Sequence, residues 1–395
     1  MPKPQKAPRN VLVLGWVSLF NDLGSEVLTR LIPFFVSGVL GAPMSVVGAI
    51  EGIADSAATL LKPVFGRLSD RFSKRKSFVA WGYGLSAVAR PFLAITGTWP
   101  FVAFLRFGDR LGKGVRTAPR DALIADSSLD SQHGRSFGLN RALDTAGAVL
   151  GVAAFAAWIW HRGETHLTPH SWVFLTLACS VPGFFALGLV IGGVVEPPAR
   201  ETLSHEAVSA KSPLNSVLKR YLVVVAIFSF ANSSDAFILL RAKDLGYSLA
   251  EILGMIVLLN IVSATTAIPA AVLSDRFGRR TLIALGWIIY AAAYFMMGSE
   301  LFSHTRVLFV LTIAIYGLFY GFTESVEKAW IADLAPRESR GRAYGIFGLI
   351  VGMVALPASV GFGWVWDHWG GEIPFMVSGA IAMVSTGLLF LWVRE

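Results

Sequence analysis

GRLSDRFSKRK, at residues 66–76, is a short basic segment between two long apolar runs. A similar segment, AVLSDRFGRR, stands at residues 271–280, and its Ser-Asp-Arg-Phe core lies 205 residues further along the chain. The tripeptide Ile-Ala-Asp repeats at nearly the same spacing, because it stands at residues 124–126 and again at 331–333. Two repeats with almost one period indicate that the chain consists of two similar halves.

Composition indicates a membrane protein. Hydrophobic residues make up 54% of the chain and charged residues 15%, and the charges cluster, which leaves apolar runs of about 20 residues that are long enough to cross a bilayer. The net charge of +8 does not indicate a nucleic-acid partner, because the basic residues alternate loop by loop as membrane topology requires. Cys179 is the only cysteine, so no disulfide or cysteine metal site can form within one chain. We expect no metal and no cofactor.

The apolar runs predict an all-α integral membrane protein with about twelve transmembrane helices in two six-helix bundles. The predicted domains are residues 1–195 and 217–395, joined by a polar cytoplasmic linker at residues 196–216. The basic segment at 66–76 and the uncharged links around it place both termini in the cytoplasm, by the positive-inside rule. We expect a bacterial-type inner or plasma membrane.

The first apolar run carries ionisable residues at membrane depth. Asp22, Glu26 and Arg30 are spaced by four residues and therefore share one helix face. Ionisable groups inside a bilayer are costly and normally face a cavity, which favours a functional role. The alternative is a buried ion pair that only ties helices together.

The fourth predicted helix, from about Phe101, carries a stripe of charge within an arc of roughly 120°. A stripe of this length cannot face lipid, so it lines a watery cavity, pairs with acids or meets an anion. Function is favoured for Arg106 and Arg110, nearer mid-membrane, whereas Arg116 and Arg120 are expected in the cytoplasmic interface. The stripe consists of Arg106, Asp109, Arg110, Lys113, Arg116 and Arg120.

The second half repeats this plan more loosely. Asn232 and Asp235 lie in the seventh predicted helix, from about Leu218 to Leu240, and echo the polar residues of the first. By the 207-residue period Arg120 corresponds to Glu327, so the halves carry opposite charges at matching places near the cytoplasmic end.

With these features the chain resembles the major facilitator superfamily over nearly its whole length. The basic segment is similar to the family's loop between helices 2 and 3, except that Ser73 stands where the family usually has glycine; in the second copy Ala271 replaces the first glycine. Arg110-Leu111-Gly112-Lys113-Gly114 resembles the family's Arg-x-x-x-Gly signature, which is commonly tied to proton coupling. The matching loop positions are Gly66, Leu68, Asp70, Arg71, Lys74 and Arg75.

The resemblance implies two bundles around a central cavity that opens alternately to either side. Gly138, Gly147 and Gly151 match half of the antiporter pattern on helix 5, where Val152 replaces the pattern's proline. This half-match and the acid in helix 1 lean towards export. The alternative is that these glycines only permit close helix packing.

We therefore expect a monomeric, proton-coupled secondary transporter of a small organic solute, with export by antiport favoured over uptake. Glu26, or Asp22 beside it, is the expected proton carrier. The expected substrate cavity involves Arg30, Arg106, Asp109, Arg110, Lys113, Asn232 and Asp235, and the expected gating residues are Asp70, Arg71, Asp275, Arg276 and Glu327.

Two other transport functions stay open: a symporter of an anionic or phosphate-bearing metabolite, since guanidinium groups bind such anions, and a lipid flippase on the same fold. An enzyme is not expected, because the sequence has no His-Glu-x-x-His, nucleophile elbow or phosphate loop.

Overall fold

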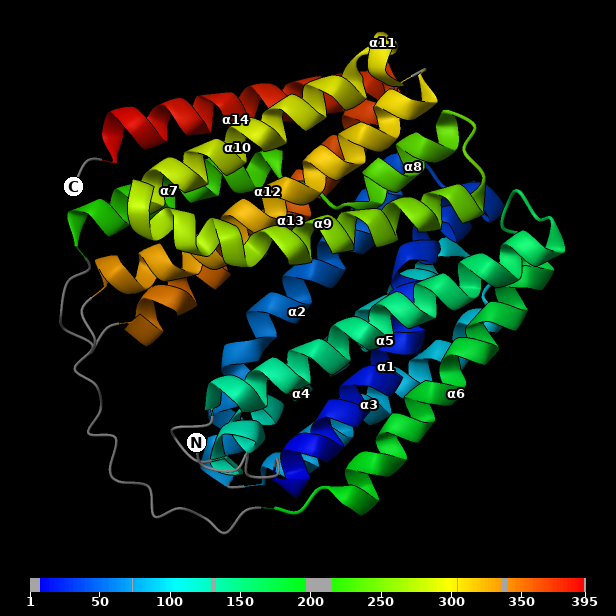
Figure 1. Cartoon of the computed structure of the whole chain (residues 1–395). Coiled ribbons are helices and arrows are strands. Elements are labelled where there is room, and N and C mark those ends of the chain that lie inside the picture. Colours follow the sequence, from blue (N-terminus) through cyan, green and yellow to red (C-terminus); the bar gives the residue numbers. More distant parts are fainter. Residues whose placement is uncertain are drawn as a thin grey trace. The chain divides into compact units, whose positions relative to one another are not determined.

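The structure is a computed structural model, and it describes residues 8–72, 74–128, 133–196, 215–303, 305–335 and 340–393. Regular structure within these ranges is helical (Figure 1). The first helices are α1 (Arg9–Phe34), α2 (Met44–Phe72), α3 (Arg75–Phe92), α4 (Trp99–Asp126), α5 (His133–Arg162) and α6 (Pro169–Gly193). The later ones are α7 (Ser216–Ala231), α8 (Ala236–Asp244), α9 (Leu249–Phe277), α10 (Arg279–Gly298), α11 (Glu300–Ser303), α12 (Arg306–Leu334), α13 (Arg340–Trp369) and α14 (Glu372–Trp392).

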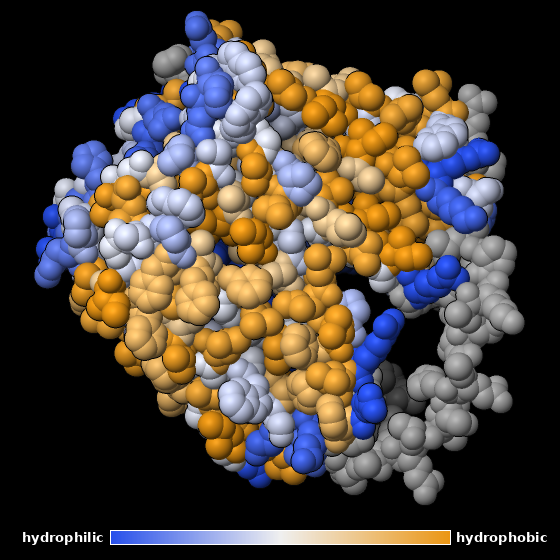
Figure 2. All heavy atoms as spheres, turned by 180° about the vertical axis from the view of Figure 1, so that it is seen from behind, coloured by the Kyte–Doolittle hydropathy of each residue, from blue (hydrophilic) through white to orange (hydrophobic). Residues whose placement is uncertain are grey.

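Among the described residues, eleven helical segments are long and apolar enough to cross a membrane, with α7 and α8 forming one of them. The other long helix, α4, has 28 residues but is too rich in charge to qualify by composition. Hydrophobic residues make up much of the surface that Figure 2 shows. These features confirm the predicted all-α, multi-pass membrane fold.

The chain forms two compact units, residues 1–42 with 57–203 and residues 43–56 with 204–395. In the first, α1 packs on α5 and α6, and α3 packs on α4 and α6. In the second, α12 packs on α9 and α10, and α14 packs on α7 and α10. The predicted domain boundaries stay a prediction, since most of the linker at 196–216 lies outside the described residues.

The first part of α2 belongs to the second unit. Its N–H groups at Met44 and Ser45 donate to the two carboxylate oxygens of Asp367, near the end of α13, at 2.7 and 2.8 Å. The free N–H groups and the positive dipole end of a helix favour such a carboxylate.

The two basic segments are more helical than the sequence suggested. We expected turns, but α2 continues to Phe72 and α9 to Phe277, so the Ser-Asp-Arg-Phe core is the last turn of each helix. The two cores are alike: Ser69 donates to the carbonyl of Gly66, and Ser274 to that of Ala271, at 2.8 and 2.7 Å.

The two sequence repeats meet in space within each unit. Arg75, at the start of α3, pairs with Asp126, at the end of α4. Arg279, at the start of α10, pairs with Asp333, near the end of α12, at 3.1 Å. In each half, therefore, an arginine of the basic segment pairs with the aspartate of the Ile-Ala-Asp tripeptide.

The seventh predicted helix is broken, contrary to the continuous helix expected from the sequence. Helical structure stops at Ala231 and resumes at Ala236. The four residues between are Asn232, Ser233, Ser234 and Asp235, whose side chains compete with helical backbone hydrogen bonds. Ser234, for example, donates its N–H to the hydroxyl of Ser359 on α13 and accepts the N–H of Ala236.

Glycines let α1 and α5 approach closely. A Cβ at Gly147 or Gly151 of α5 would lie 2.2 or 2.1 Å from the carbonyl oxygens of Leu19 and Leu23 on α1. A Cβ at Gly138 would meet nothing within 4 Å. The packing interpretation of the helix-5 glycines therefore holds for Gly147 and Gly151.

Candidate functional site: a polar cluster inside the first unit

Two carboxyl groups face each other where α1 and α5 approach. Asp144 of α5 reaches the carboxyl of Asp22 on α1 closely enough to hydrogen-bond with it. Asp22 also accepts hydrogen bonds from the amide of Asn21 (2.7 Å) and the hydroxyl of Ser25 (3.2 Å). A hydrogen bond between two carboxyl groups requires a proton on one of them. The pair is therefore suited to hold a proton.

A chain of polar groups leads from Asp22 to α3 and α4. Arg90 of α3 donates to the side-chain oxygen of Asn21 at 2.8 Å and pairs with Asp109 of α4 at 3.6 Å. Arg110 pairs with the same aspartate at 3.6 Å. Arg90 is 2% exposed, so these partners, and not water, compensate its positive charge.

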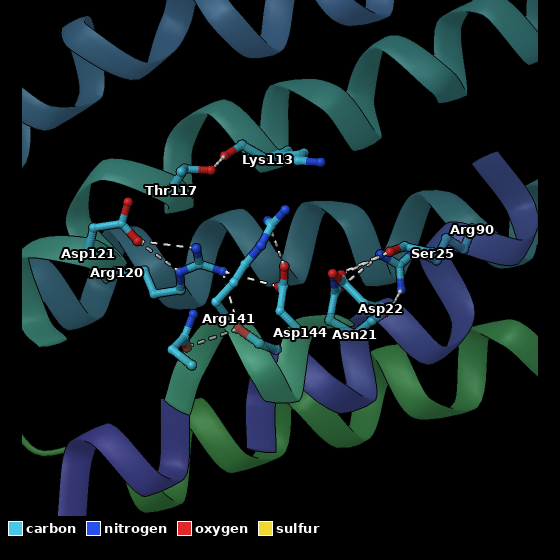
Figure 3. Close-up of polar contacts among 12 residues, drawn as sticks. Asn21, Asp22, Ser25, Arg90, Lys113, Thr117, Arg120, Asp121, Arg141 and Asp144 are labelled. Carbon is cyan, nitrogen blue, oxygen red and sulfur yellow. Dashed lines mark hydrogen bonds and ion pairs between the residues drawn. The ribbon is translucent and has the colours of Figure 1, made fainter. Parts of the chain in front are cut away.

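The other end of the cluster surrounds Asp144. Arg120 of α4 lies 3.9 Å from this carboxylate and Arg141 of α5 lies 3.5 Å from it. Arg120 also pairs with Asp121 at 3.1 Å. In Figure 3 the two groups of side chains lie in one row, with Arg120 and Asp144 on one side and Asn21, Ser25 and Arg90 on the other.

The charged stripe of α4 turns inward as predicted for Arg106 and Arg110. Both guanidinium groups donate to the hydroxyl of Thr29 on α1, at 3.0 and 2.6 Å. Arg106 and Arg110 are buried. Lys113 lies within electrostatic range of Asp22 and Glu26.

Arg116, which we expected in the cytoplasmic interface, packs against α3, and its depth in the membrane stays a prediction. Its side chain is buried, donates to the hydroxyl of Ser86 at 2.7 Å, and lies 4.5 Å from the ring centroid of Tyr83. Ser86 and Tyr83 of α3 therefore provide a hydrogen-bond acceptor and an aromatic ring for the guanidinium inside the unit.

Glu26 stands apart from the carboxyl pair. It lies 3.9 Å from Arg30 one turn along α1, and both side chains are about a quarter exposed. The predicted face of three charges is present, but Glu26 is paired with Arg30, whereas Asp22 joins the Asp144 cluster.

The second unit holds its own half-buried carboxylate. Asp235, at the break between α7 and α8, accepts hydrogen bonds from the hydroxyls of Tyr316 (2.8 Å) and Tyr320 (3.0 Å) on α12. Tyr290 and Tyr294 of α10 stack beside them, with ring centroids 4.0 Å apart. Asn232, at the end of α7, donates its backbone N–H to the carbonyl of Phe228, and its place in a substrate cavity stays a prediction.

The predicted gating residues have mixed surroundings. Glu327 accepts a hydrogen bond from the indole of Trp287 at 3.3 Å. Asp275 pairs with Arg279 at 2.7 Å, and Arg276 is exposed. Arg71 is also exposed, and the side chain of Asp70 lies outside the described part of the chain. Their gating role stays a prediction.

Sequence reasoning missed two parts of the site. Arg90 is a lone charge in an apolar run, and that isolation is the signal that could have found it. The tyrosines around Asp235 carry no such signal, because tyrosine is intermediate in burial and its presence in an apolar run does not reveal a polar partner.

This fold and cluster define a polytopic membrane protein with ionisable groups held inside its helical units, an arrangement typical of secondary transporters. The chain belongs to the Major Facilitator Superfamily, whose family model matches residues 14–263 and 221–395.

Similar proteins include an uncharacterized MFS-type transporter of Methanocaldococcus jannaschii, 32% identical over 98% of this chain and 95% of its own length. The multidrug resistance protein MdtH of an Enterobacter species is 24% identical over 94% of this chain and 90% of its own. Among solved structures, a point mutant of the nucleoside transporter NupG has a TM-score of 0.81 at 11% identity, covering 96% of this chain and 99% of that one. The D-xylose–proton symporter has a TM-score of 0.75 at 17% identity, covering 98% and 97%.

Proposed function

We propose that the chain is a proton-coupled secondary transporter that exports a small organic solute. The observation that carries the proposal is the carboxyl pair Asp22–Asp144, which can hold a proton between α1 and α5. Its position next to the Arg90–Asp109–Arg110 chain supports coupling, because gain or loss of that proton changes the charge that the buried arginines meet.

In this proposal Asp22 carries the coupled proton, a role that we expected first of Glu26. Glu26 already has Arg30 as a cationic partner, so protonating it would break an ion pair. The hydrogen-bond donors to Asp22 are a neutral amide and a neutral hydroxyl. Protonation of Asp22 therefore breaks no close ion pair and removes only longer-range attraction, such as that of Lys113.

Export is also favoured by sequence similarity to multidrug resistance proteins. Multidrug resistance proteins named MdtH are similar to this chain over most of its length. The proposal carries with it a cytoplasmic location of both termini, on the positive-inside rule.

An uptake symporter of an anionic solute is the second candidate. Its support is the side-by-side position of Arg106 and Arg110 on Thr29, because two guanidinium groups suit a phosphate or carboxylate. Arg110→Ala should then abolish binding of a phosphate ester, and Arg110→Lys should restore part of it.

The test uses purified protein in proteoliposomes with an imposed pH gradient. The probes are an organic cationic dye, a phosphate ester and a fluorescent phospholipid, and proton flux is read with a trapped pH indicator. We expect dye movement coupled to proton counterflow. Movement of the phosphate ester with protons would favour the symporter, and movement of the phospholipid would favour a flippase.

The matched variants are Asp22→Asn, Asp144→Asn and Glu26→Gln. We expect Asp22→Asn and Asp144→Asn to lose gradient-driven accumulation at least tenfold and to retain exchange, which needs no net proton movement. Glu26→Gln should accumulate within about threefold of wild type. Undiminished accumulation in the Asp22→Asn, Asp144→Asn double variant would overturn the role of the pair.

A further inference from the structure

A groove of about 950 Å³ lies on the first unit, outside the polar cluster. Its walls come from α2, α3, α4 and α6. Its lining is apolar over nearly its whole extent and includes Phe72, Trp81, Leu111 and Leu187. Trp81 is 77% exposed. The groove therefore opens to the surroundings of the unit and not to its core.

Small residues hollow the groove. Gly84 of α3 lines it, and a Cβ there would meet only the methyl carbons of Leu187, at 3.8 Å. This is an ordinary van der Waals contact, so a larger side chain at residue 84 would project into the groove.

One end of the groove is cationic. Lys74, between α2 and α3, is exposed and lines that end. Arg67 and Arg71, in the last turns of α2, are exposed near it in the chain. The ammonium of Lys76 donates to the carbonyl of Ile191, another lining residue, at 2.8 Å. The apolar lining and the cationic end match an amphiphile with an anionic head.

The groove has the length of a leaflet. From Lys74 to Val88, both of which line it, α3 rises by roughly 21 Å. One leaflet of a bilayer has a hydrocarbon depth of roughly 15 Å. An acyl chain can therefore lie along α3 while its phosphate stays at the helix end, where juxtamembrane basic residues attract anionic lipids.

We propose that this groove is a binding site for one anionic phospholipid, with the phosphate at Lys74 and an acyl chain between Trp81 and Gly84. The site is separate from the Asp22–Asp144 pair and does not depend on the transported solute.

Native mass spectrometry of the purified full chain tests the proposal. The probes are phosphatidylglycerol and phosphatidylcholine with identical acyl chains. Wild type should retain one phosphatidylglycerol about tenfold more tightly than phosphatidylcholine. Lys74→Ala should reduce this preference at least fivefold, and Gly84→Leu should weaken binding of both lipids at least fivefold.

Two matched controls accompany these variants. Lys219→Ala removes an exposed lysine from α7, and Gly188→Leu fills an exposed position of α6 where a Cβ meets nothing. Both should bind like wild type. Ala80→Leu, which also lines the groove, replaces Gly84→Leu if that variant does not fold. Equal retention of both lipids by wild type, or equal losses in the controls, would overturn the site.

Discussion

Arg90 connects three helices of the first unit, because it lies on α3, bonds to Asn21 on α1 and pairs with Asp109 on α4. Its near-complete burial makes these contacts necessary. Removing one partner of a buried pair leaves the other charge uncompensated, which typically costs roughly 3–5 kcal/mol.

Arg90→Ala should therefore lower the melting temperature of the detergent-solubilised protein clearly, and Arg90→Lys should restore only part, because lysine cannot bond to Asn21 and Asp109 through one planar fork. The control is Arg67→Ala, an exposed arginine of the same unit, which should melt like wild type. Equal melting of Arg90→Ala and the control would show that the chain of contacts does not stabilise the unit.

Glu164, in the loop between α5 and α6, should make the stability of the fold depend on pH. Partial burial opposes the shift, but hydrogen bonds from Ser171 and Arg162 hold the pKa of Glu164 below its ordinary value. A folded-state pKa below the unfolded value stabilises the fold above the unfolded pKa of about 4.3.

This contribution is lost as pH falls through the folded-state pKa. Glu164→Gln should therefore melt below wild type at pH 7, and the difference should shrink towards zero below about pH 4. A difference that grows on acidification would have the wrong sign for a lowered pKa.

Single residues also show what sequence reasoning reached. Asp22, Arg106 and Arg110 could be predicted as inward-facing because a charge in an apolar helix has few other places to go. Arg116 could not be assigned, because its burial depends on Tyr83 and Ser86 from another helix. When a polar side chain is buried because its partners lie on another helix, the local sequence pattern does not show that burial.

Among the elements, the long helices could be predicted from the apolar runs of the sequence, but the break between α7 and α8 could not. A hydropathy pattern averages over a window, so four polar residues between Ala231 and Ala236 shift it little. Their contacts with α13 and α12 decide the break, and these contacts belong to tertiary structure.

The approach of α1 and α5 yields a prediction about helix 5. Gly147→Leu would place carbon atoms against the α1 backbone and should lower the free energy of unfolding by about 1–3 kcal/mol, as overpacking does. It should also separate Asp22 from Asp144 and so impair proton coupling. Gly138→Leu meets open space and is the matched control. If Gly138→Leu abolishes transport while the protein still folds, the pattern has a role beyond packing.

The whole molecule is built from two related halves, and this was the most accessible feature of the sequence. In each half an arginine of the basic segment, Arg75 or Arg279, pairs with the aspartate of the Ile-Ala-Asp tripeptide. The internal arrangement of polar groups diverged: the first unit has a carboxyl pair with arginines, and the second has Asp235 among tyrosines. The two units therefore share a helical framework but hold different polar groups inside it.

The repeated ion pair gives a prediction for the two units together. Asp126→Asn and Asp333→Asn each remove the carboxylate partner of an arginine, Arg75 or Arg279. Both pairs are partly exposed, so each loss should cost roughly 0.2–1 kcal/mol, or at most a few degrees of melting temperature. Because the pairs lie in separate units, the double variant should lose the sum of the two effects within about 0.5 kcal/mol.

The rescue experiment identifies the pair itself as the cause. Exchanging the charges within the first unit, as Arg75→Asp with Asp126→Arg, should recover part of the loss seen with Asp126→Asn. It should not compensate for Asp333→Asn, whose arginine lies in the other unit. Recovery of the second unit by the exchange, or a double variant far from additivity, would mean that the two basic segments are coupled across the halves. Independent effects on melting combined with a shared slowing of transport would instead fit two gates that act in one cycle.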